Sequence, residues 1–183
     1  MTVQNPQEFT AVLRNLRQRR QFTDQPIPED ILTDILEVAR WSGSASNTQP
    51  WEFIVVTDKE KIRKIAESGK HSGFLAGAPL VIVIVLNGER ALSESYDEGR
   101  VSERILLAAD AYGLIGGTGW FSTPDAWDPV KQLLNIPAEK ATHQALGLGY
   151  PDPAAGNGLA RLGGRRPFND VVRFETYDGI RES

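Results

Sequence analysis

Apolar residues recur at intervals of three and four positions along several stretches of the chain, which is the spacing of one helix face. Near the N-terminus this face carries Phe9, Val12, Leu13 and Leu16. Flanking residues help to place the ends, because Pro28 suits a first helical position and Gly113 suits the position after a last one. The pattern predicts helices over residues 6–20, 28–41, 57–67, 97–112 and 128–135.

Continuous apolar runs predict the strands. Residues 80–86 read Leu-Val-Ile-Val-Ile-Val-Leu, which is typical of a central strand covered on both faces. Shorter runs predict strands over residues 53–56, 114–121, 144–148 and 171–175, the last of them at a sheet edge. Helices and strands alternate loosely, so we expect an α+β fold in which helices wrap a sheet.

Two stretches lack a clear pattern. Residues 87–96 are polar and predict a loop or a short mobile helix, which is also the one candidate for a lid over a substrate. Residues 151–164 are rich in Gly and Pro, which suits an arm that becomes ordered on contact with another surface. No repeat or linker divides the chain, so we expect one domain over residues 1–183, with residues 151–183 as a C-terminal arm.

The composition excludes several kinds of site. The chain has 183 residues, no Cys and two His, so disulfides, thiolate chemistry, Cys-based metal sites and a three-His catalytic metal site are excluded. The formal net charge of −4 gives no general attraction to nucleic acid. The N-terminus lacks a signal-peptide pattern, and the longest apolar run is too short to span a bilayer. We expect a cytoplasmic protein with no nucleic-acid or membrane partner, whose chemistry comes from a bound cofactor or from carboxylates and hydroxyls.

Two glycine-rich stretches invite comparison with dinucleotide-binding loops. Residues 113–119 read Gly-Leu-Ile-Gly-Gly-Thr-Gly, but they follow a predicted helix and lack the G-x-G-x-x-G spacing. Gly147 and Gly149 follow a predicted strand, but Asp152 stands at the third glycine position. We therefore exclude a Rossmann-type dinucleotide fingerprint.

Two groups of arginines are candidates for binding an anion. They are Arg14, Arg17, Arg19 and Arg20 at the end of the first predicted helix, and Arg165 and Arg166 in the tail. The simplest interpretation of the first group is a solvated helix end, because cations there face the negative end of the helix dipole. The alternative is a phosphate clamp, since guanidinium groups match phosphate oxygens. Two separated groups in an acidic protein favour one small anion over a nucleic-acid track.

Residues 44–51 read Ser-Ala-Ser-Asn-Thr-Gln-Pro-Trp and connect a predicted helix to a predicted strand. One interpretation is an ordinary connection with Pro50 at the strand start. The small residues also allow a flat ligand to approach the backbone, and Asn47 and Gln49 present amide donors and acceptors. A site lined by backbone and amide groups suits a planar heterocycle.

These motifs occur in a characteristic order along nearly the whole chain. The first are Arg17-x-x-Arg20-x-Phe22, Pro26-Ile27-Pro28 and Ser44-x-x-Asn47-x-Gln49-Pro50-Trp51. The later ones are Ala78-Pro79, Gly117-Thr118-Gly119-Trp120, Gly149-Tyr150-Pro151 and Arg165-Arg166-Pro167. In this order they closely resemble the nitroreductase family of FMN-dependent flavoproteins. The resemblance implies an α+β homodimer with a central, mostly antiparallel sheet, an FMN at each of two subunit interfaces, and a C-terminal arm on the partner subunit.

The resemblance also implies which residues bind FMN. The phosphate and the ribityl chain are expected on Arg17 and Arg20, with help from Gln18 and Arg19, and on Arg165 or Arg166. The segment that reaches the flavin from the other subunit matches Ser44, Ala45 and Asn47, and Gln49 is a further candidate in the same motif. The stretch whose backbone meets the ring edge near its reactive nitrogen matches Gly117, Thr118, Gly119 and Trp120. Three positions depart from the residues frequent in the family, namely Leu16, Gln18 and Gly43.

The activity implied by the resemblance is that of an FMN-dependent oxidoreductase that uses NADH or NADPH. A hydride passes to the flavin, the oxidised nicotinamide leaves, and an organic acceptor such as a nitroaromatic or a quinone binds the same face, so ping-pong kinetics are expected. Since the cofactor carries the chemistry, no catalytic side chain and no metal ligand are assigned. Three alternatives stay open: a flavin-binding or storage protein without turnover, a reductive dehalogenase or flavin-fragmenting enzyme with a substrate lid, and an anion-binding structural domain.

The histidines and tryptophans have ordinary structural interpretations. His71 and His143 have no second ligand at metal spacing, so a structural or exposed position is expected for each. Trp41 is expected in the core or in an interface. Trp120 and Trp127 are candidates for the substrate side, with core packing as the alternative.

Overall fold

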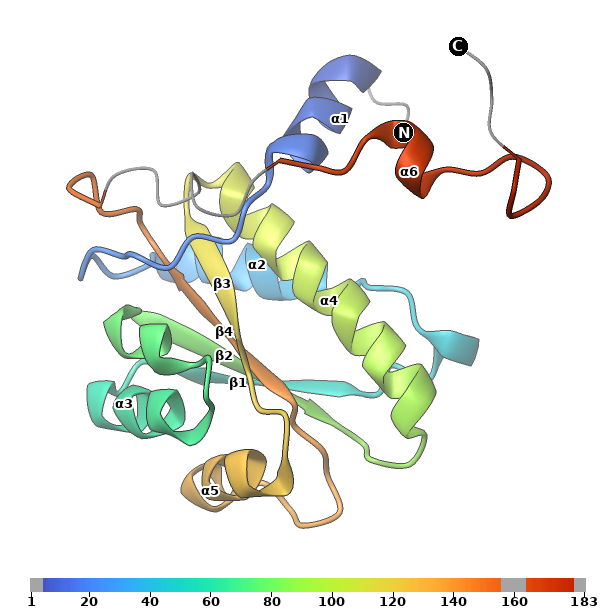
Figure 1. Ribbon diagram of the computed structural model, residues 1–183. Coiled ribbons are helices and arrows are strands. Elements are labelled where there is room, and N and C mark those ends of the chain that lie inside the picture. The colour runs from blue at the N-terminus through green and yellow to red at the C-terminus, as the bar shows by residue number, and fades with distance from the viewer. Residues whose placement is uncertain (1–4, 156–163, 180–183) are drawn as a thin grey trace. The chain divides into compact units, whose positions relative to one another are not determined.

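The computed structural model describes residues 5–155 and 164–179, and the chain divides into two compact units (Figure 1). The first unit runs to Pro153 and contains the sheet and the helices that cover it. The second unit begins at Ala154, close to the predicted start of the C-terminal arm. One domain over the whole chain stays a prediction.

Helices and strands alternate along the first unit. In chain order they are α1 (Pro6–Asn15), α2 (Glu29–Arg40), η1 (Ala45–Asn47), β1 (Trp51–Val56), α3 (Lys59–Ser68), η2 (Gly73–Gly77), β2 (Leu80–Leu86), α4 (Ala91–Ala111), β3 (Ile115–Trp120), α5 (Pro124–Leu134) and β4 (Gln144–Gly149), where η marks a short 3-10 helix. The described residues of the second unit form α6 (Phe168–Val171).

The four strands form one antiparallel sheet in the order β1-β2-β4-β3. β2 pairs with β1 on one side and with β4 on the other, and all of its residues are buried. This confirms the central strand that we expected for residues 80–86. The two edge strands are β1 and β3. Together with the covering helices, the sheet confirms the predicted α+β class.

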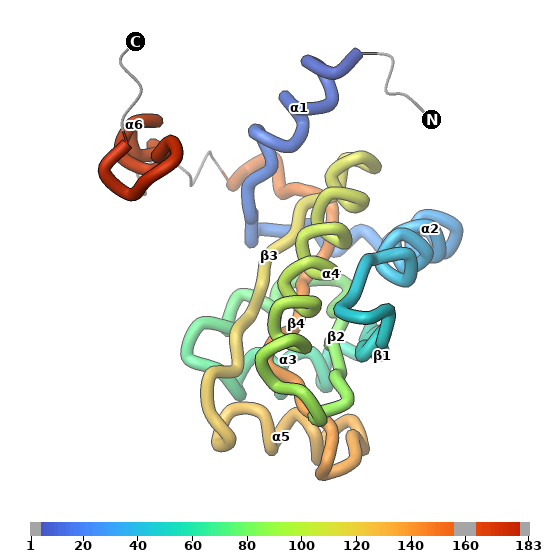
Figure 2. Tube along the Cα trace, turned by 90° about the vertical axis from the view of Figure 1, so that its right-hand side faces the viewer, coloured from blue at the N-terminus to red at the C-terminus, as the bar shows by residue number. Residues whose placement is uncertain are grey.

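Helices cover both faces of the sheet (Figure 1; Figure 2). On one face α2 and α4 enclose a core that includes Ile35 and Val101. On the other face α3, η2 and α5 enclose a second core that includes Ile65 and Leu75. Successive residues of β2 enter the two cores in alternation, which explains why this strand has no polar positions.

Glycines in β3 and β4 let η2 approach the sheet closely. A Cβ atom at Gly119 would lie 2.7 Å from Leu75 Cδ1, and a Cβ atom at Gly147 would lie 3.0 Å from Leu75 Cδ2. Leu75 itself is fully buried. These glycines therefore serve packing against η2, in agreement with the absence of a dinucleotide fingerprint in the sequence.

The first helix is shorter than its periodicity predicts. α1 ends at Asn15, and the backbone of Leu16 leaves helical geometry with a ψ of 129°. The N–H of Arg19 then donates to the carbonyl of Gly116 at 2.8 Å. The edge of a sheet offers unpaired backbone groups. Residues that the pattern assigned to the helix are therefore hydrogen-bonded to β3 instead. The interpretation as a helix end holds for Arg14, in the last turn of α1, but is wrong for Arg19 and Arg20, which lie beyond the end of that helix.

α4 begins at Ala91 instead of residue 97 and includes most of the stretch expected to be a loop or a short mobile helix. Glu94 explains the difference, because its carboxylate accepts hydrogen bonds from the N–H groups of Gly88, Glu89 and Arg90 at 2.8–3.0 Å. An acidic residue in the first turns also faces the positive end of the helix dipole. The preceding loop is thereby fixed to the start of α4, so residues 87–96 do not form a free lid.

A further prediction from the sequence is wrong. In place of a strand over residues 171–175, the described part of the second unit has α6, followed by a bend and a turn. Apolar residues favour a strand only where another strand is available to pair with, and the described residues of this unit provide none.

Candidate functional site

The predicted phosphate-binding segment lies along the outer edge of β3. Beside the backbone bond from Arg19 to Gly116, the side chain of Gln18 is hydrogen-bonded twice to Thr118. Gln18 Oε1 accepts from the Thr118 N–H at 3.1 Å, and Gln18 Nε2 donates to Thr118 Oγ1 at 3.3 Å. The structure thus brings residues 17–20 together with residues 117–120. The amide of Gln18 serves to attach the segment to β3.

Arg20 carries the guanidinium group best placed to bind an anion. The group lies 4.8 Å from the centroid of the Phe74 ring, a cation–π contact that restrains the side chain. A Cβ atom at Gly117 would lie 3.0 Å from Arg20 Cγ, so glycine at this position lets the side chain lie close to β3. Within the described residues the guanidinium makes no hydrogen bond or ion pair, so its N–H donors are available to a ligand.

The neighbouring arginines have different surroundings. Arg17 Nη1 donates to the carbonyls of Arg14 and Leu16 at 2.6 and 2.7 Å, so its guanidinium caps the C-terminus of α1. Arg19 is half-buried, and its backbone N–H is hydrogen-bonded to the carbonyl of Gly116. Together the three cations create a positive potential at this edge of the sheet, which attracts a phosphate group.

The predicted flavin-facing loop, residues 44–49, has an unusual backbone. Ser46, Asn47 and Gln49 have left-handed φ values of 52°, 55° and 47°. The turn is closed by Ser44, whose hydroxyl accepts the N–H of Gln49 at 2.9 Å. Residues 45–49 are exposed, so the loop presents backbone and amide groups to solvent.

One chain does not bring this loop and the basic edge of β3 together. In both views η1 lies on the opposite side of α4 from β3 (Figure 1; Figure 2). The N–H of Ala45 instead donates to Asp97 of α4 at 2.9 Å. Arg165 and Arg166 belong to the second unit, where Arg166 Nη2 donates to the carbonyl of Asp170 at 3.0 Å. Within the first unit, the predicted cofactor-binding residues thus form two separate groups.

Three buried carboxylates on α4 were missed by the sequence analysis. Glu94, Asp97 and Glu98 are only 4%, 2% and 1% exposed. Their spacing of three and four positions continues the buried face that carries Val101 and Ile105. Acidic residues within an apolar helix face are a signal that could have found them, because buried carboxylates require partners.

Glu98 pairs with His143, which lies beside Trp120 at the end of β3. Glu98 Oε2 is 2.9 Å from His143 Nδ1, and Glu98 Oε1 is buried without a hydrogen bond. The ring centroid of His143 lies 6.2 Å from that of Trp120 and 5.5 Å from that of Trp127. The hydrogen bond to Glu98 raises the pKa of His143 above its usual 6.5, against the opposing effect of burial. A titratable side chain therefore lies next to the predicted flavin-contacting segment.

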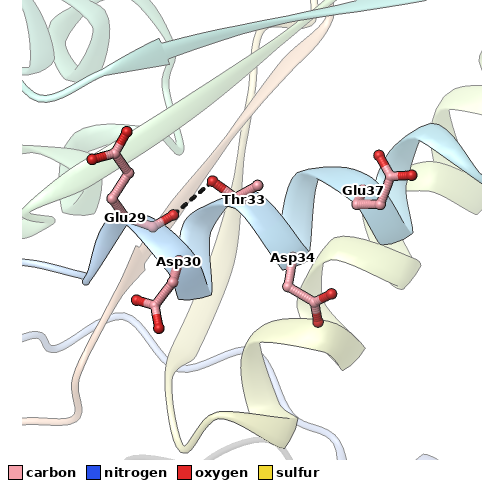
Figure 3. Close-up of a pocket in the computed structure, with 5 residues that line it drawn as sticks. All are labelled: Glu29, Asp30, Thr33, Asp34 and Glu37. Carbon is pink, nitrogen blue, oxygen red and sulfur yellow. Dashed lines mark hydrogen bonds between the residues drawn. The ribbon is translucent and has the colours of Figure 1, made fainter.

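An open depression of about 700 Å³ lies on α2, and no predicted site residue lines it (Figure 3). Its lining residues are Glu29, Asp30, Thr33, Asp34 and Glu37. Four carboxylates repel a phosphate group, so this depression is not an anion site. Within the described ranges, no cluster of three or more potential metal ligands occurs, and no helix has the length and apolar character needed to cross a bilayer.

Comparison with known proteins connects this arrangement to one family. A family model described as the nitroreductase family matches residues 13–72, which include the basic segment and the loop at residues 44–49. NADH dehydrogenase from Thermus thermophilus is 28% identical in an alignment of 177 positions that covers 78% of this chain and 85% of that protein. Iodotyrosine deiodinase 1 from Homo sapiens is 29% identical in an alignment of 190 positions that covers 84% of this chain and 64% of that protein. The solved structure of an FMN-dependent nitroreductase from Clostridium difficile R20291 has a TM-score of 0.77 at 24% identity, and the match covers 92% of this chain and 99% of that one.

The similarity in structure extends over nearly all of both chains and defines an α+β protein with the nitroreductase fold. In sequence, residues 13–72 of this chain are similar to the nitroreductase family.

We expect the stability of the protein to depend on the protonation of His143. Because Glu98 raises the pKa of His143 in the folded state above the value of 6.5 taken for the unfolded chain, the protonated histidine stabilises the fold. This contribution is complete below pH 6.5 and is lost as the pH rises through the raised pKa. His143→Gln should therefore lower the free energy of unfolding more at about pH 5.5 than at about pH 9, as measured by urea denaturation.

His71→Gln is the matched control, because His71 is exposed and has no ion pair within the described residues. Equal losses for His143→Gln at both pH values would contradict the expectation. So would an NMR titration that places the pKa of His143 at or below 6.5.

Proposed function

We propose that the protein is an FMN-dependent oxidoreductase that takes a hydride from NADH or NADPH and passes it to an organic acceptor such as a nitroaromatic or a quinone. The observation that carries the proposal is the unpaired guanidinium of Arg20, on a basic segment that is hydrogen-bonded to the glycine-rich edge of β3. The match of residues 13–72 to the nitroreductase family and the nitroreductase fold support it. The T. thermophilus relative is named as an NADH dehydrogenase, and the C. difficile protein of the same fold is described as FMN-dependent.

The phosphate of FMN would bind to residues 17–20. Guanidinium N–H groups form charge-assisted hydrogen bonds with phosphate oxygens, and Arg20 offers such groups with its side chain restrained by Phe74. Arg17 and Arg19 add positive charge beside it. One compact basic cluster suits a phosphate monoester, whereas a pyrophosphate is usually held by a glycine fingerprint that this chain lacks. The residues present therefore fit FMN better than FAD.

The ring of FMN would lie along residues 117–120. Three of these four residues are small, so a ring edge can approach the backbone. Trp120 is 45% exposed and would border the ring. FMN supplies the hydride-accepting ring when bound, so the residues of the chain bind it, orient it and exclude water, and no side chain is assigned a catalytic role. Because donor and acceptor would use the same face in turn, we expect ping-pong kinetics.

We propose that two subunits form each flavin site. The loop at residues 44–49 lies across α4 from the basic edge of its own chain, so a second copy would supply the loop. Exposed apolar residues support an interface between copies, because patches of this kind are typical of contact surfaces. No residue of α1 is buried, and its apolar residues Phe9, Val12 and Leu13 are 50%, 43% and 42% exposed. Trp41, which follows α2, is 70% exposed.

Reductive dehalogenation is a second candidate, favoured by the similarity to iodotyrosine deiodinase 1. This alternative was expected to need a lid that recognises one substrate, with residues 87–96 as the candidate. Residues 91–96 instead belong to α4, and Glu94 fixes the loop before them. The oxidoreductase that reduces an acceptor such as a nitroaromatic or a quinone is therefore better supported than the dehalogenase.

Purified protein should be yellow and should release FMN on denaturation, because its basic cluster suits a single phosphate monoester. It should also oxidise NADH or NADPH when a quinone is supplied. The measurements are the visible absorption spectrum, chromatography of the released flavin and a turnover assay. Recovery of FAD, or apoprotein that cannot be reconstituted with FMN, would contradict the proposal. Bound FMN without turnover would identify a flavin-binding or storage protein instead.

Arg20→Ala should weaken FMN binding by roughly ten- to a hundred-fold, since a hydrogen bond to a charged group contributes about 1.5–3 kcal/mol. Arg19→Ala is the matched control, because it removes the same charge and leaves the backbone bond to Gly116 in place. The dissociation constant for FMN, measured by fluorescence titration of apoprotein, distinguishes the two variants. Equal and negligible effects of Arg17→Ala, Arg20→Ala and Arg165→Ala would show that these arginines are only solvated charge.

The full-length protein should sediment as a dimer and should retain FMN on dilution. Removal of all residues after Gly149 should cause loss of FMN together with dissociation or aggregation, because the truncation removes Arg165 and Arg166 along with the predicted arm. Sedimentation velocity across a dilution series, followed at a flavin absorption wavelength, tests both statements. A folded monomer that keeps FMN at nanomolar concentration would refute the two-subunit site.

A further inference from the structure

We propose that Asp97 is a positioning residue for the cofactor: its buried carboxylate holds the loop at residues 44–49 in the conformation that contacts FMN. The inference rests on the proposed function, because the contact that Asp97 would control is the one between this loop and the flavin. It assigns a role to a residue that the sequence motifs leave out.

The loop needs support because its backbone conformation is unfavourable. Left-handed φ values occur at Ser46, Asn47 and Gln49, and of these residues only Asn adopts that conformation readily. Hydrogen bonds inside the loop close the turn, from the Gln49 N–H to Ser44 Oγ and from Thr48 Oγ1 to the carbonyl of Ala45. They define the local shape, but they do not attach the loop to the rest of the molecule.

α4 provides the attachment. Asp97 Oδ2 accepts the N–H of Ala45 at 2.9 Å. Arg100 Nη1 lies 3.3 Å from Asp97 Oδ1 and 3.4 Å from the carbonyl of Gly43. Arg104 Nη1 donates to the carbonyl of Trp41 at 3.1 Å. Of the three α4 side chains, Asp97 is the buried one, at 2% exposure, whereas the Arg100 side chain is 54% exposed.

Burial makes the Asp97 contact the strongest of these attachments. A hydrogen bond to a carboxylate away from water is strengthened by charge and by the low local dielectric. α4 is also a rigid support, because Val101 and Ile105 on the same helix are fully buried in the core. Because the buried Asp97 carboxylate accepts the Ala45 N–H, the exposed groups of residues 45–49 are kept in one arrangement that faces solvent. A preorganised loop loses less conformational freedom when a ligand binds, so affinity rises.

Glu94 allows this role to be separated from a general effect on stability. It lies one helical turn before Asp97, is 4% exposed, and likewise accepts backbone N–H groups from a neighbouring loop. The loop that it holds, at residues 88–90, contains none of the predicted cofactor-binding residues. Loss of either carboxylate should destabilise the fold, but only loss of Asp97 should alter the flavin site.

The experiment compares Asp97→Asn and Asp97→Ala with Glu94→Gln and Glu94→Ala in the full-length protein. Three quantities are measured for each variant: the dissociation constant for FMN by fluorescence titration of apoprotein, urea unfolding of the apoprotein, and the sedimentation coefficient. The visible circular dichroism of FMN at saturation reports the geometry of the bound ring. The Asn and Gln variants preserve side-chain size, so they keep the comparison usable if an Ala variant fails to fold.

We expect Asp97→Ala to weaken FMN binding by roughly ten- to a hundred-fold, as for loss of a hydrogen bond to a charged group, and Asp97→Asn to weaken it by about three- to tenfold. Both Asp97 variants should change the circular dichroism of bound FMN. The Glu94 variants should keep FMN affinity within about twofold, even where they unfold at lower urea concentration than wild type.

Equal losses of FMN affinity in the Asp97 and Glu94 variants would overturn the inference, as would wild-type affinity in the Asp97 variants. A loss that follows only from dissociation of the dimer, seen in the sedimentation coefficient, would also overturn it. Failure of wild-type protein to bind FMN is a different result, since it would refute the proposed function itself.

Discussion

The arrangement of this protein depends on three carboxylates that α4 buries against the rest of the first unit. A buried charge must be compensated by hydrogen bonds or by an opposite charge. Glu94, Asp97 and Glu98 obtain this compensation from the loop before α4, from the N–H of Ala45 and from His143, respectively. One helix face therefore holds the loop predicted to contact FMN, through Ala45, and also the histidine that lies beside Trp120. It also explains why α4 extends over residues that are polar in sequence.

The edge of β3 imposes a second, local constraint. An edge strand has unpaired backbone groups, and here they bond to residues 18 and 19 in place of another strand. Small residues in β3 leave room for this, since a Cβ atom at Gly117 would meet Arg20 and Phe74 at 3.0–3.3 Å. The result protects a strand edge that would otherwise be open to pairing with another chain. It also gives a basic segment a defined place beside a surface that a planar ring can approach.

The two halves of the proposed flavin site lie on opposite sides of α4, and this separation has an energetic consequence. If each site takes one half from each subunit, FMN binds only to the associated form, and binding and association then stabilise one another by mass action. The exposed apolar residues of α1 and Trp41 fit this arrangement, because association would remove them from water. Cofactor retention and subunit association would then be a single equilibrium.

Local pattern in the sequence determined much of the fold. The apolar run of β2 predicts a strand buried on both faces, because no polar residue interrupts it, and the order of motifs from Arg17 to Arg166 carries the family resemblance. Tertiary structure alone decided where distant groups compete for hydrogen bonds. Arg19 donates its N–H to the carbonyl of Gly116 at the sheet edge, so α1 stops before it. Glu94 accepts N–H groups of the loop before α4, so the helix begins earlier than its pattern indicates.

The same distinction holds for the candidate site. Arginines, small residues and amides are recognisable in sequence because their chemistry is local to each motif. The contacts of Asp97 with Ala45, of Glu98 with His143 and of Gln18 with Thr118 join residues 45 to 100 positions apart. Nothing in the local sequence indicates such partners, because only packing of α4 and β3 brings them within hydrogen-bonding distance.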